Sequence, residues 1–277
     1  MVPAVAPIRL VVTGDGFGLS AARNRGIMAG HRNGLVTSTS VLGNADEPMA
    51  LLAELGAAAG LGTGVLLALT GGAPVAPALA VSSLVGPDGR FPLRGRDFLL
   101  VWAKAALRAE EIEREFDAQV TRWRGLGLRI DHLATKDHLA ALPVVAAAAE
   151  RTARKHGIAG LRTVVEKPTL AWVADLPRGL ATAGMGAMAW FSRRQLGTLR
   201  HGPQTWGHFE AGQLDEIRLL EFVGRLGPGG HELLCAPELE TPESIPPRSE
   251  VAALCSDRVR AAVARRGIEL CRWAELF

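Results

Sequence analysis

Apolar residues along the chain fall into two kinds of segment that alternate from one end to the other. Short runs rich in Val, Ile and Leu, such as residues 8–12 (IRLVV), are typical of buried strands. Longer segments repeat apolar residues at helical spacing, most clearly Ile112, Phe116, Val120 and Trp123. The predicted strands are residues 8–12, 35–42, 64–70, 128–133, 160–165, 232–235 and 268–272. The predicted helices are residues 20–32, 48–59, 109–124, 143–156, 214–225 and 257–266.

This alternation predicts an α/β protein with a mostly parallel sheet. Right-handed crossovers between parallel strands build either a barrel or an open doubly wound sheet, and the pattern alone leaves both open. Residues 71–98 are rich in turn signals. Residues 166–207 have weak periodicity and hold three of the six tryptophans, so we expect a variable cap or loop region there. Because no linker or internal repeat interrupts residues 1–277, we expect a single domain.

Composition and charge exclude several classes of protein. Of the 277 residues 48% are hydrophobic, which suits a sizeable core and argues against a disordered chain. The 31 basic and 28 acidic residues give a net charge of +3, and the basic residues are scattered. We therefore expect no nucleic-acid partner and no membrane surface as a partner. No window reaches the roughly 18 uncharged apolar residues that a membrane span needs.

The cysteines and the N-terminus bear on the compartment and on cofactors. Cys235, Cys255 and Cys271 have no C-x-x-C spacing, and MVPAVAPIRLVV lacks the basic start and long apolar stretch of an export signal. We expect reduced thiols in a cytoplasmic protein. No G-x-G-x-x-G follows the first predicted strand, and DGFGLS is not a phosphate-binding P-loop, so a nucleotide cofactor has little support.

Polar residues gather where predicted strands end, which is where α/β enzymes carry their chemistry. Asp15 follows the first strand and stands between Gly14 and Gly16. Thr70 is the polar side chain at the end of GVLLALTGG, and HELLCAPE (residues 231–238) contains a later strand and the residues that follow it. The richest segment, DHLATKDHLAALP (residues 131–143), contains Asp131, His132, Lys136, Asp137 and His138.

In these segments the chain resembles the YdjC-like carbohydrate deacetylases, the family that includes the ChbG and HpnK proteins. VVTGDGFGLS is similar to the pattern N/T-A/G-D-D-F-G-L-S, and LGTGVLLALTGGAPV to G-x-H-L-x-L-T-x-G. IDHLATKDHLAALP is similar to H-x-D/N-S/A-H-x-H-x-H-x-x-P, and HELLCAPE to E-L-M-C-H-P-G. The similarity covers nearly the whole chain in the right order. It implies a distorted (β/α) TIM-like barrel of mostly parallel strands, related to the polysaccharide deacetylases.

The family also implies a divalent metal held by one Asp and two His, with a further Asp as general base. Such a metal activates water for attack on the acetyl group of an N-acetylated amino sugar. Residue by residue, the presumed base is kept as Asp15, and His132 and His138 remain. The expected metal ligands fall on Gly16, Leu66 and Lys136, the expected acid on Ala236, and the Asp or Asn of H-x-D/N on Ala134. Since none of these side chains is a metal ligand, we expect no metal cofactor.

Four residues are the candidates for catalysis. Asp15 is interpreted as an acid/base whose pKa burial could tune, or as a hydrogen-bonding residue at a strand end. Lys136, Asp137 and His138 form either a site cluster or an ion pair on the rim of the barrel. Lys136 is notable because a fixed positive charge could take over part of a metal's electrostatic role.

Four further residues are candidates for substrate binding. Arg162 could hold an anionic or sugar group, or pair with Glu166. Trp206, like Trp172 and Trp190, could stack on a substrate or belong to the core of the cap. Thr70 and His132 complete the set, with His132 more suited to supporting other residues than to direct chemistry.

Three hypotheses about function follow. The first is a metal-independent enzyme in which Asp15 is the acid/base for isomerisation, elimination or cyclisation of a small molecule, in a biosynthetic setting such as specialised metabolism. The second is a pseudoenzyme that binds without turnover. The third is a deacetylase of an N-acetylated amino sugar with an altered metal site built from Asp15, Asp137 and His138. The sequence leaves a homodimer open.

Overall fold

The computed structural model describes residues 6–103, 107–166, 172, 175–195, 200–201, 204–241, 245–247 and 249–276. Within these residues nine strands form one sheet, and every strand pairing in it is parallel. The strands are β1 (Ile8–Phe17), β2 (Ser38–Leu42), β3 (Gly62–Leu67), β4 (His132–Thr135), β5 (Gly160–Leu161), β6 (Arg200–His201), β7 (Gln204–Trp206), β8 (Gly229–Cys235) and β9 (Ile268–Leu270).

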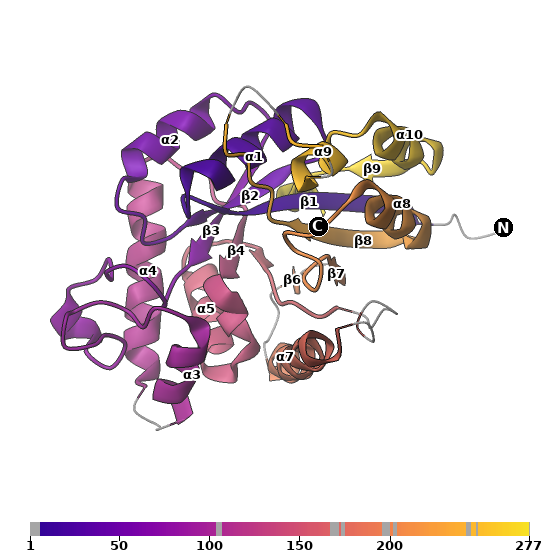
Figure 1. Cartoon of the computed structure of the whole chain (residues 1–277). Helices are drawn as coiled ribbons and strands as arrows, with labels where there is room; N and C mark the ends of the chain where they lie inside the picture. The colour runs from indigo at the N-terminus through magenta and orange to yellow at the C-terminus, as the bar shows by residue number, and fades with distance from the viewer. Residues whose placement is uncertain are drawn as a thin grey trace.

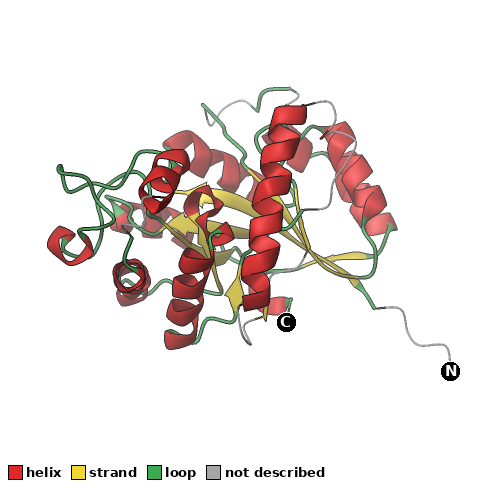
Figure 2. Ribbon diagram, turned by 90° about the horizontal axis from the view of Figure 1, so that it is seen from below, coloured by secondary structure: helices red, strands yellow, loops and turns green. Residues whose placement is uncertain are grey.

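Helices surround this sheet (Figures 1 and 2). They are α1 (Ala21–Asn33), α2 (Pro48–Gly56), α3 (Gly95–Ala103), α4 (Ala109–Gly125), α5 (Pro143–Lys155), α7 (Leu176–Gln195), α8 (Glu216–Arg225), α9 (Glu250–Leu254) and α10 (Asp257–Arg265). Three short 3-10 turns, η1 (Ala78–Val81), η2 (Lys136–Ala141) and η3 (Trp273–Glu275), complete the described elements. No described helix has the length and apolar character needed to cross a membrane.

The sheet curls into a distorted barrel, which confirms the predicted fold. Its strand order is β6-β5-β4-β3-β2-β1-β8-β7, with β9 pairing beside the first residues of β1. The two ends of this order, β6 and β7, are only two residues apart in the chain, at 201 and 204. One short stretch of chain therefore pairs with β5 on one side and with β8 on the other.

Alternate residues of each strand point into the barrel or out toward the helices. On β1, Leu10 and Val12 belong to the main hydrophobic core, whereas Val11 belongs to a separate small cluster with Trp273. The same alternation places Thr13 and Asp15 on the inner face of β1. The interior is thus lined by a different set of side chains from the helix-packed core, and it is this set that forms the site.

The region expected to be a variable cap or loop, residues 166–207, contains regular structure. It includes the 20-residue helix α7 and the strands β6 and β7. The hydrophobic pattern missed α7 because Leu180, Trp190 and Phe191 are half or more exposed, so no single apolar stripe marks a buried face. Strands of two and three residues are too short to show a period. Helix α3 was also missed: it begins inside the stretch expected to be loop, residues 71–98, and continues to Ala103.

A buried glutamine braces the end of β3, from which the loop toward the site departs. The Gln119 side chain on α4 accepts a hydrogen bond from the Ala68 N–H (2.9 Å) and donates one to the Ala68 carbonyl (2.7 Å). It also donates to Glu115, whose carboxylate accepts the N–H groups of Val75 and Ala76. These contacts satisfy backbone groups that follow the strand and have no ladder partner.

We expect Gln119→Ala to destabilise the protein by about 2–4 kcal/mol, because the buried N–H and C=O of Ala68 would each lose their partner. For a chain of this size the loss corresponds to a melting temperature lower by roughly 5–15 °C, measurable by calorimetry. The control is Gln213→Ala at an exposed position, which should leave the melting temperature unchanged. Equal melting temperatures for the two variants would refute the bracing role.

Candidate active site

Asp15 stands at the carboxyl end of β1, where the strand makes a bulge. The pairing register between β1 and β2 shifts between Asp15 and Phe17, so Gly16 is the extra residue. Gly16 has a φ of +86°, which an L side chain rarely adopts, and a Cβ there would lie 2.3 Å from Leu19 Cδ1. The bulge directs the Asp15 carboxylate toward the barrel end while leaving no room for a side chain at Gly16 without a shift of Leu19.

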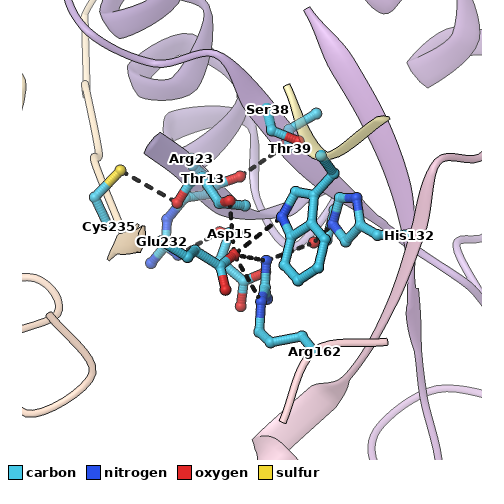
Figure 3. Close-up of polar contacts among 12 residues, drawn as sticks. Thr13, Asp15, Arg23, Ser38, Thr39, His132, Arg162, Glu232 and Cys235 are labelled. Atoms are coloured by element: carbon cyan, nitrogen blue, oxygen red, sulfur yellow. Dashed lines mark hydrogen bonds and ion pairs between the residues drawn. The ribbon is translucent and has the colours of Figure 1, made fainter. Parts of the chain in front are cut away.

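A buried arginine is the direct partner of Asp15. Arg162, one residue beyond β5, is 3% exposed, and its Nη1 donates to Asp15 Oδ1 at 2.7 Å. The same guanidinium donates through Nε to Glu232 Oε1 at 3.0 Å and through Nη2 to Ser40 Oγ at 3.2 Å. Figure 3 shows the Arg162 guanidinium beside the two carboxylates. The sequence-based alternative that Arg162 pairs with Glu166 is wrong, because Glu166 accepts the backbone N–H groups of Gly207 and Phe209 instead.

Glu232 anchors this arginine from the floor of the barrel. It is fully buried on β8, and its Oε1 also accepts from Thr13 Oγ1 at 2.7 Å and from Trp273 Nε1 at 3.2 Å. A lone buried carboxylate is costly, and the Arg162 guanidinium, 2.9 Å away, is the partner that compensates for the burial of Glu232. Asp15 is the exposed end of the trio, with 23% of its side chain accessible.

His132 extends the network on the other side of Arg162. Its Nε2 lies 3.0 Å from Ser40 Oγ, its Nδ1 lies 2.6 Å from Asp131 Oδ1, and its ring stacks on Trp273. The ring fills space that β3 leaves open, since a Cβ at Gly64 would lie 2.4 Å from His132 Cε1. Because His132 is fully buried and both ring nitrogens have partners, the geometry gives it a supporting position beneath the site.

The charges around Asp15 keep it ionised. Burial opposes ionisation, but the Arg162 guanidinium and the neighbouring His138, together with hydrogen bonds from Arg162 and Ser40, hold the pKa of Asp15 below its ordinary value of 3.8. At neutral pH this carboxylate is therefore a base and not an acid.

Two histidines lie beside the carboxylate. His138 interacts electrostatically with both Asp15 and Arg162, and its ring meets the ring of His208 edge-on, with centroids 4.3 Å apart. Burial and the Arg162 charge lower the pKa of His138 to about 4 despite the opposing effect of Asp15. Burial, His138 and Arg178 lower the pKa of His208 to about 3. Both imidazoles are neutral at pH 7, and neither ring nitrogen of either has a hydrogen-bond partner among the described residues.

The backbone that carries His138 is strained. Asp137 and His138 both have a φ of +53°, the left-handed region that residues other than glycine rarely occupy. The first of these, Asp137, is exposed, and its Oδ2 accepts a hydrogen bond from Thr70 Oγ1 at 2.7 Å. Strain of this kind is found where surrounding contacts fix a functional side chain. Here it turns His138 toward Asp15 and Asp137 toward Thr70.

Three other residues predicted from sequence have their contacts away from Asp15. The Lys136 ammonium donates to the Thr70 carbonyl at 2.8 Å, and Lys136 is not among the groups that shift the pKa of Asp15. The Trp206 indole donates to His231 Nδ1 at 3.3 Å and packs edge-on against Phe222, under α8. The fully buried Thr70 side chain is engaged by Asp137. Of the eight predicted residues, Asp15, His138 and Arg162 come together.

The side chains at this end of the barrel do not fit the metal that the resemblance implies. The position of one expected ligand is the bulge glycine Gly16, that of another is the buried, apolar Leu66, and that of the third is Lys136, a cation. Asp15, the acid next to them, is paired with Arg162. Throughout the described parts of the chain, no group of three or more His, Cys, Asp or Glu residues is placed to hold a metal ion. The alternative set of Asp15, Asp137 and His138 is therefore not assembled in this geometry.

Comparison with known proteins identifies the family. Residues 9–265 match the model of the family described as YdjC-like protein. The chain belongs to this family. It is 30% identical over 274 residues to a chitooligosaccharide deacetylase of Salmonella paratyphi B, covering 93% of this chain and 95% of the relative. It is 28% identical to a carbohydrate deacetylase of Geobacillus stearothermophilus, covering 98% and 99% of the two chains.

A solved structure supports the same fold. A crystal structure of an Enterococcus faecalis protein, assigned to cellobiose-phosphate cleavage, aligns with a TM-score of 0.76 at 22% identity. The alignment covers 98% of this chain and 99% of that one, so the two proteins share their fold over the length of the chain.

Sequence reasoning missed Glu232, Trp273 and His208. Glu232 lies in the strand segment HELLC. An acidic residue inside a buried apolar strand is the one sequence signal that could have identified it, because such a residue needs a charged or hydrogen-bonding partner. His208 lies in a segment without periodicity, and nothing in its neighbours distinguishes it from a surface histidine. Trp273 reaches the barrel from the C-terminal turn η3, and only the fold reveals that placement.

We expect the contribution of Asp15 to stability to depend on pH. Because folding lowers its pKa below 3.8, the ionised form stabilises the fold above that pH and the contribution is lost as pH falls through the lowered value. The difference in unfolding free energy between the wild type and Asp15→Asn, from urea titrations, should be constant between pH 5 and 8 and shrink toward pH 3. Asp88→Asn, in an exposed turn, is the control. A difference that does not change over this range would contradict the pairing with Arg162.

Proposed function

We propose that this member of the YdjC-like family is an enzyme that transfers protons on a small molecule without a metal, with Asp15 as the general base. The observation that carries the proposal is the state of Asp15, a partly exposed carboxylate held ionised by a buried arginine at the end of a barrel. Carboxyl ends of barrel strands are where such enzymes place their catalytic groups.

The roles follow from which groups can accept or donate a proton. Asp15 Oδ1 is engaged by Arg162, so the other carboxylate oxygen is the one directed to substrate. Arg162 cannot take the proton itself, and it keeps Asp15 in the form that can. The neutral imidazole of His138 can donate a hydrogen bond to an oxygen that gains charge as the proton leaves. Isomerisation, elimination and cyclisation all need this pair of functions.

The substrate class is drawn from the walls of the site and from the relatives. The names of the relatives refer to carbohydrates and chitooligosaccharides, which supports a hydroxylated molecule. The replacement of expected histidines by Leu66 and Ala236 supports one less polar than an oligosaccharide. We propose a cytoplasmic biosynthetic enzyme, with no metal among its cofactors.

Deacetylation of an N-acetylated sugar is the second candidate, and the full-length similarity to named deacetylases favours it. It would require a metal site from groups that the described geometry does not bring together. A protein that binds without turnover is the third possibility, which the experiment below also separates.

The decisive experiment follows turnover in D₂O. Purified protein, with and without chelator, is incubated with mixtures of small metabolites, and NMR detects deuterium incorporation or new products. We expect activity that resists chelation and that falls by about 10²–10⁴ in Asp15→Asn, the range for loss of a general acid or base. Chitooligosaccharides are included, with acetate release as the readout.

Three outcomes would count against the proposal. Stoichiometric bound metal with chelator-sensitive acetate release would establish the deacetylase. Product formation by Asp15→Asn at the wild-type rate would remove Asp15 from the mechanism. Saturable binding of a metabolite that is never converted would support the pseudoenzyme.

The pH dependence of kcat/KM gives a separate prediction. Since the pKa of His138 is about 4 and that of Asp15 is below 3.8, we expect no change in rate between pH 5 and 8 and a decline on acidification near pH 4. In His138→Gln only Asp15 titrates, so the decline should become that of a single proton and should remain below pH 5. A decline centred between pH 6 and 7 in the wild type would show that His138 is not perturbed as the geometry requires.

A further inference from the structure

A cavity adjoins the turn that follows β1. Its volume is about 570 Å³, which lies within the range of roughly 300–1,000 Å³ for small-ligand pockets. Gly18, Leu42 and Lys136 contribute to its wall, and the N-terminal end of α2 forms its rim. The cavity is therefore continuous with the elements that carry Asp15 but has a lining of its own.

Lys136 brings an uncompensated positive charge to this cavity. Its ammonium donates to the Thr70 carbonyl at 2.8 Å, and it forms no ion pair with any acid in the described part of the chain. An ammonium has three donors, so two remain for a ligand. Arg90, which is exposed, adds a second cation to the lining, while the acids Asp46 and Glu47 are exposed at the rim, where solvent and salt screen them.

Asn44 supplies a complementary acceptor. Its amide nitrogen donates to the carbonyls of Gly71 (2.9 Å) and Ala73 (3.0 Å), which fixes the orientation of the side chain. Its Oδ1 is buried and has no partner, although Asn44 is only 6% exposed and lines the cavity. A buried acceptor without a partner is costly, and a ligand hydroxyl or amine would satisfy it.

The Gly71-Gly72 turn makes room for both groups. A Cβ at Gly71 would lie 2.8 Å from Lys136 Nζ, and one at Gly72 would lie 2.9 Å from Asn44 Nδ2. Both glycines also have left-handed φ angles, +66° and +76°. The turn thus holds the ammonium and the amide on the same side of the cavity.

We propose that this cavity binds an organic anion that also carries a hydroxyl or amine group, with Lys136 holding the anionic group and Asn44 Oδ1 accepting from the donor. A carboxylate and a phosphate both provide the anion that an ammonium binds, and the cavity accommodates a molecule of monosaccharide size. This inference names the substrate class of the proposed enzyme, and in that respect it rests on the proposed function. Binding of the anion can be measured without turnover.

The experiment is calorimetric titration of the full chain with glucuronate, glucose 6-phosphate and glucose. We expect at least one of the two anions to bind tenfold or more tightly than glucose, and the stronger of them distinguishes a carboxylate ligand from a phosphate ligand. Lys136→Gln should abolish the preference, and Lys136→Arg should retain part of it. Lys155→Gln is the matched control, because Lys155 is 62% exposed and pairs with Asp117 on α4.

Equal binding of glucose and both anions, or unchanged anion binding in Lys136→Gln, would overturn the inference. Asp15→Asn separates it from the proposed function. If the protein binds the anions and Asp15→Asn still turns over substrate, the proposed function is wrong and the anion site is supported. If Asp15→Asn loses turnover and the wild type shows no preference for anions, the proposed function is supported and the anion site is refuted.

Discussion

The interaction on which the interior of this barrel depends is the contact of one guanidinium with two carboxylates. Arg162 is 3% exposed, and Glu232 is fully buried. Removing one partner of such a pair typically costs about 3–5 kcal/mol, because the remaining charge is left without compensation. The arginine is not held for stability alone, however, since its remaining donors reach Asp15 and Ser40. The Arg162 charge, which pairs with Glu232 inside the fold, also keeps Asp15 ionised, and Asp15 is the partly exposed carboxylate of the three groups.

The small residues of the inner strand faces follow from the same constraint. A Cβ at Gly64 would overlap the His132 ring, and one at Gly160 would lie 2.9 Å from the Trp273 ring. These glycines admit the two large rings that enclose the ion pairs and exclude water from Glu232. The barrel interior is thus polar at its centre and sealed below by Trp273, which leaves the carboxyl end of the strands as the place where a ligand can meet charged groups.

Local pattern and family resemblance predicted the framework well, because strand and helix periodicity depend on neighbouring residues. The barrel, Asp15 at a strand tip and the histidine segment all came from such signals. The pairing of Arg162 with Glu232 could not be predicted from such signals, because 70 residues separate the two and the alternative partner Glu166 is nearer in sequence. The contact of His138 with His208 depends in the same way on two turns that meet only in the fold. Helix α7 was not predicted because its large apolar residues are partly exposed, whereas helical periodicity detects only helices with one buried apolar face.

The replacements at the expected metal positions differ in their consequences. Gly16 and Leu66 remove donors, whereas Lys136 adds a charge. If that charge replaced the metal at Asp15, the ammonium would be among the groups that lower its pKa, but Arg162 and His138 are those groups. The lysine is instead fixed by the Thr70 carbonyl and lines the cavity beyond Gly18. The positive charge of Lys136 therefore lies on the wall of the neighbouring cavity and not beside Asp15. Arg162 holds Asp15 in the deprotonated form that the proposed base requires, and Lys136, which lies apart from that carboxylate, is available to the proposed anion.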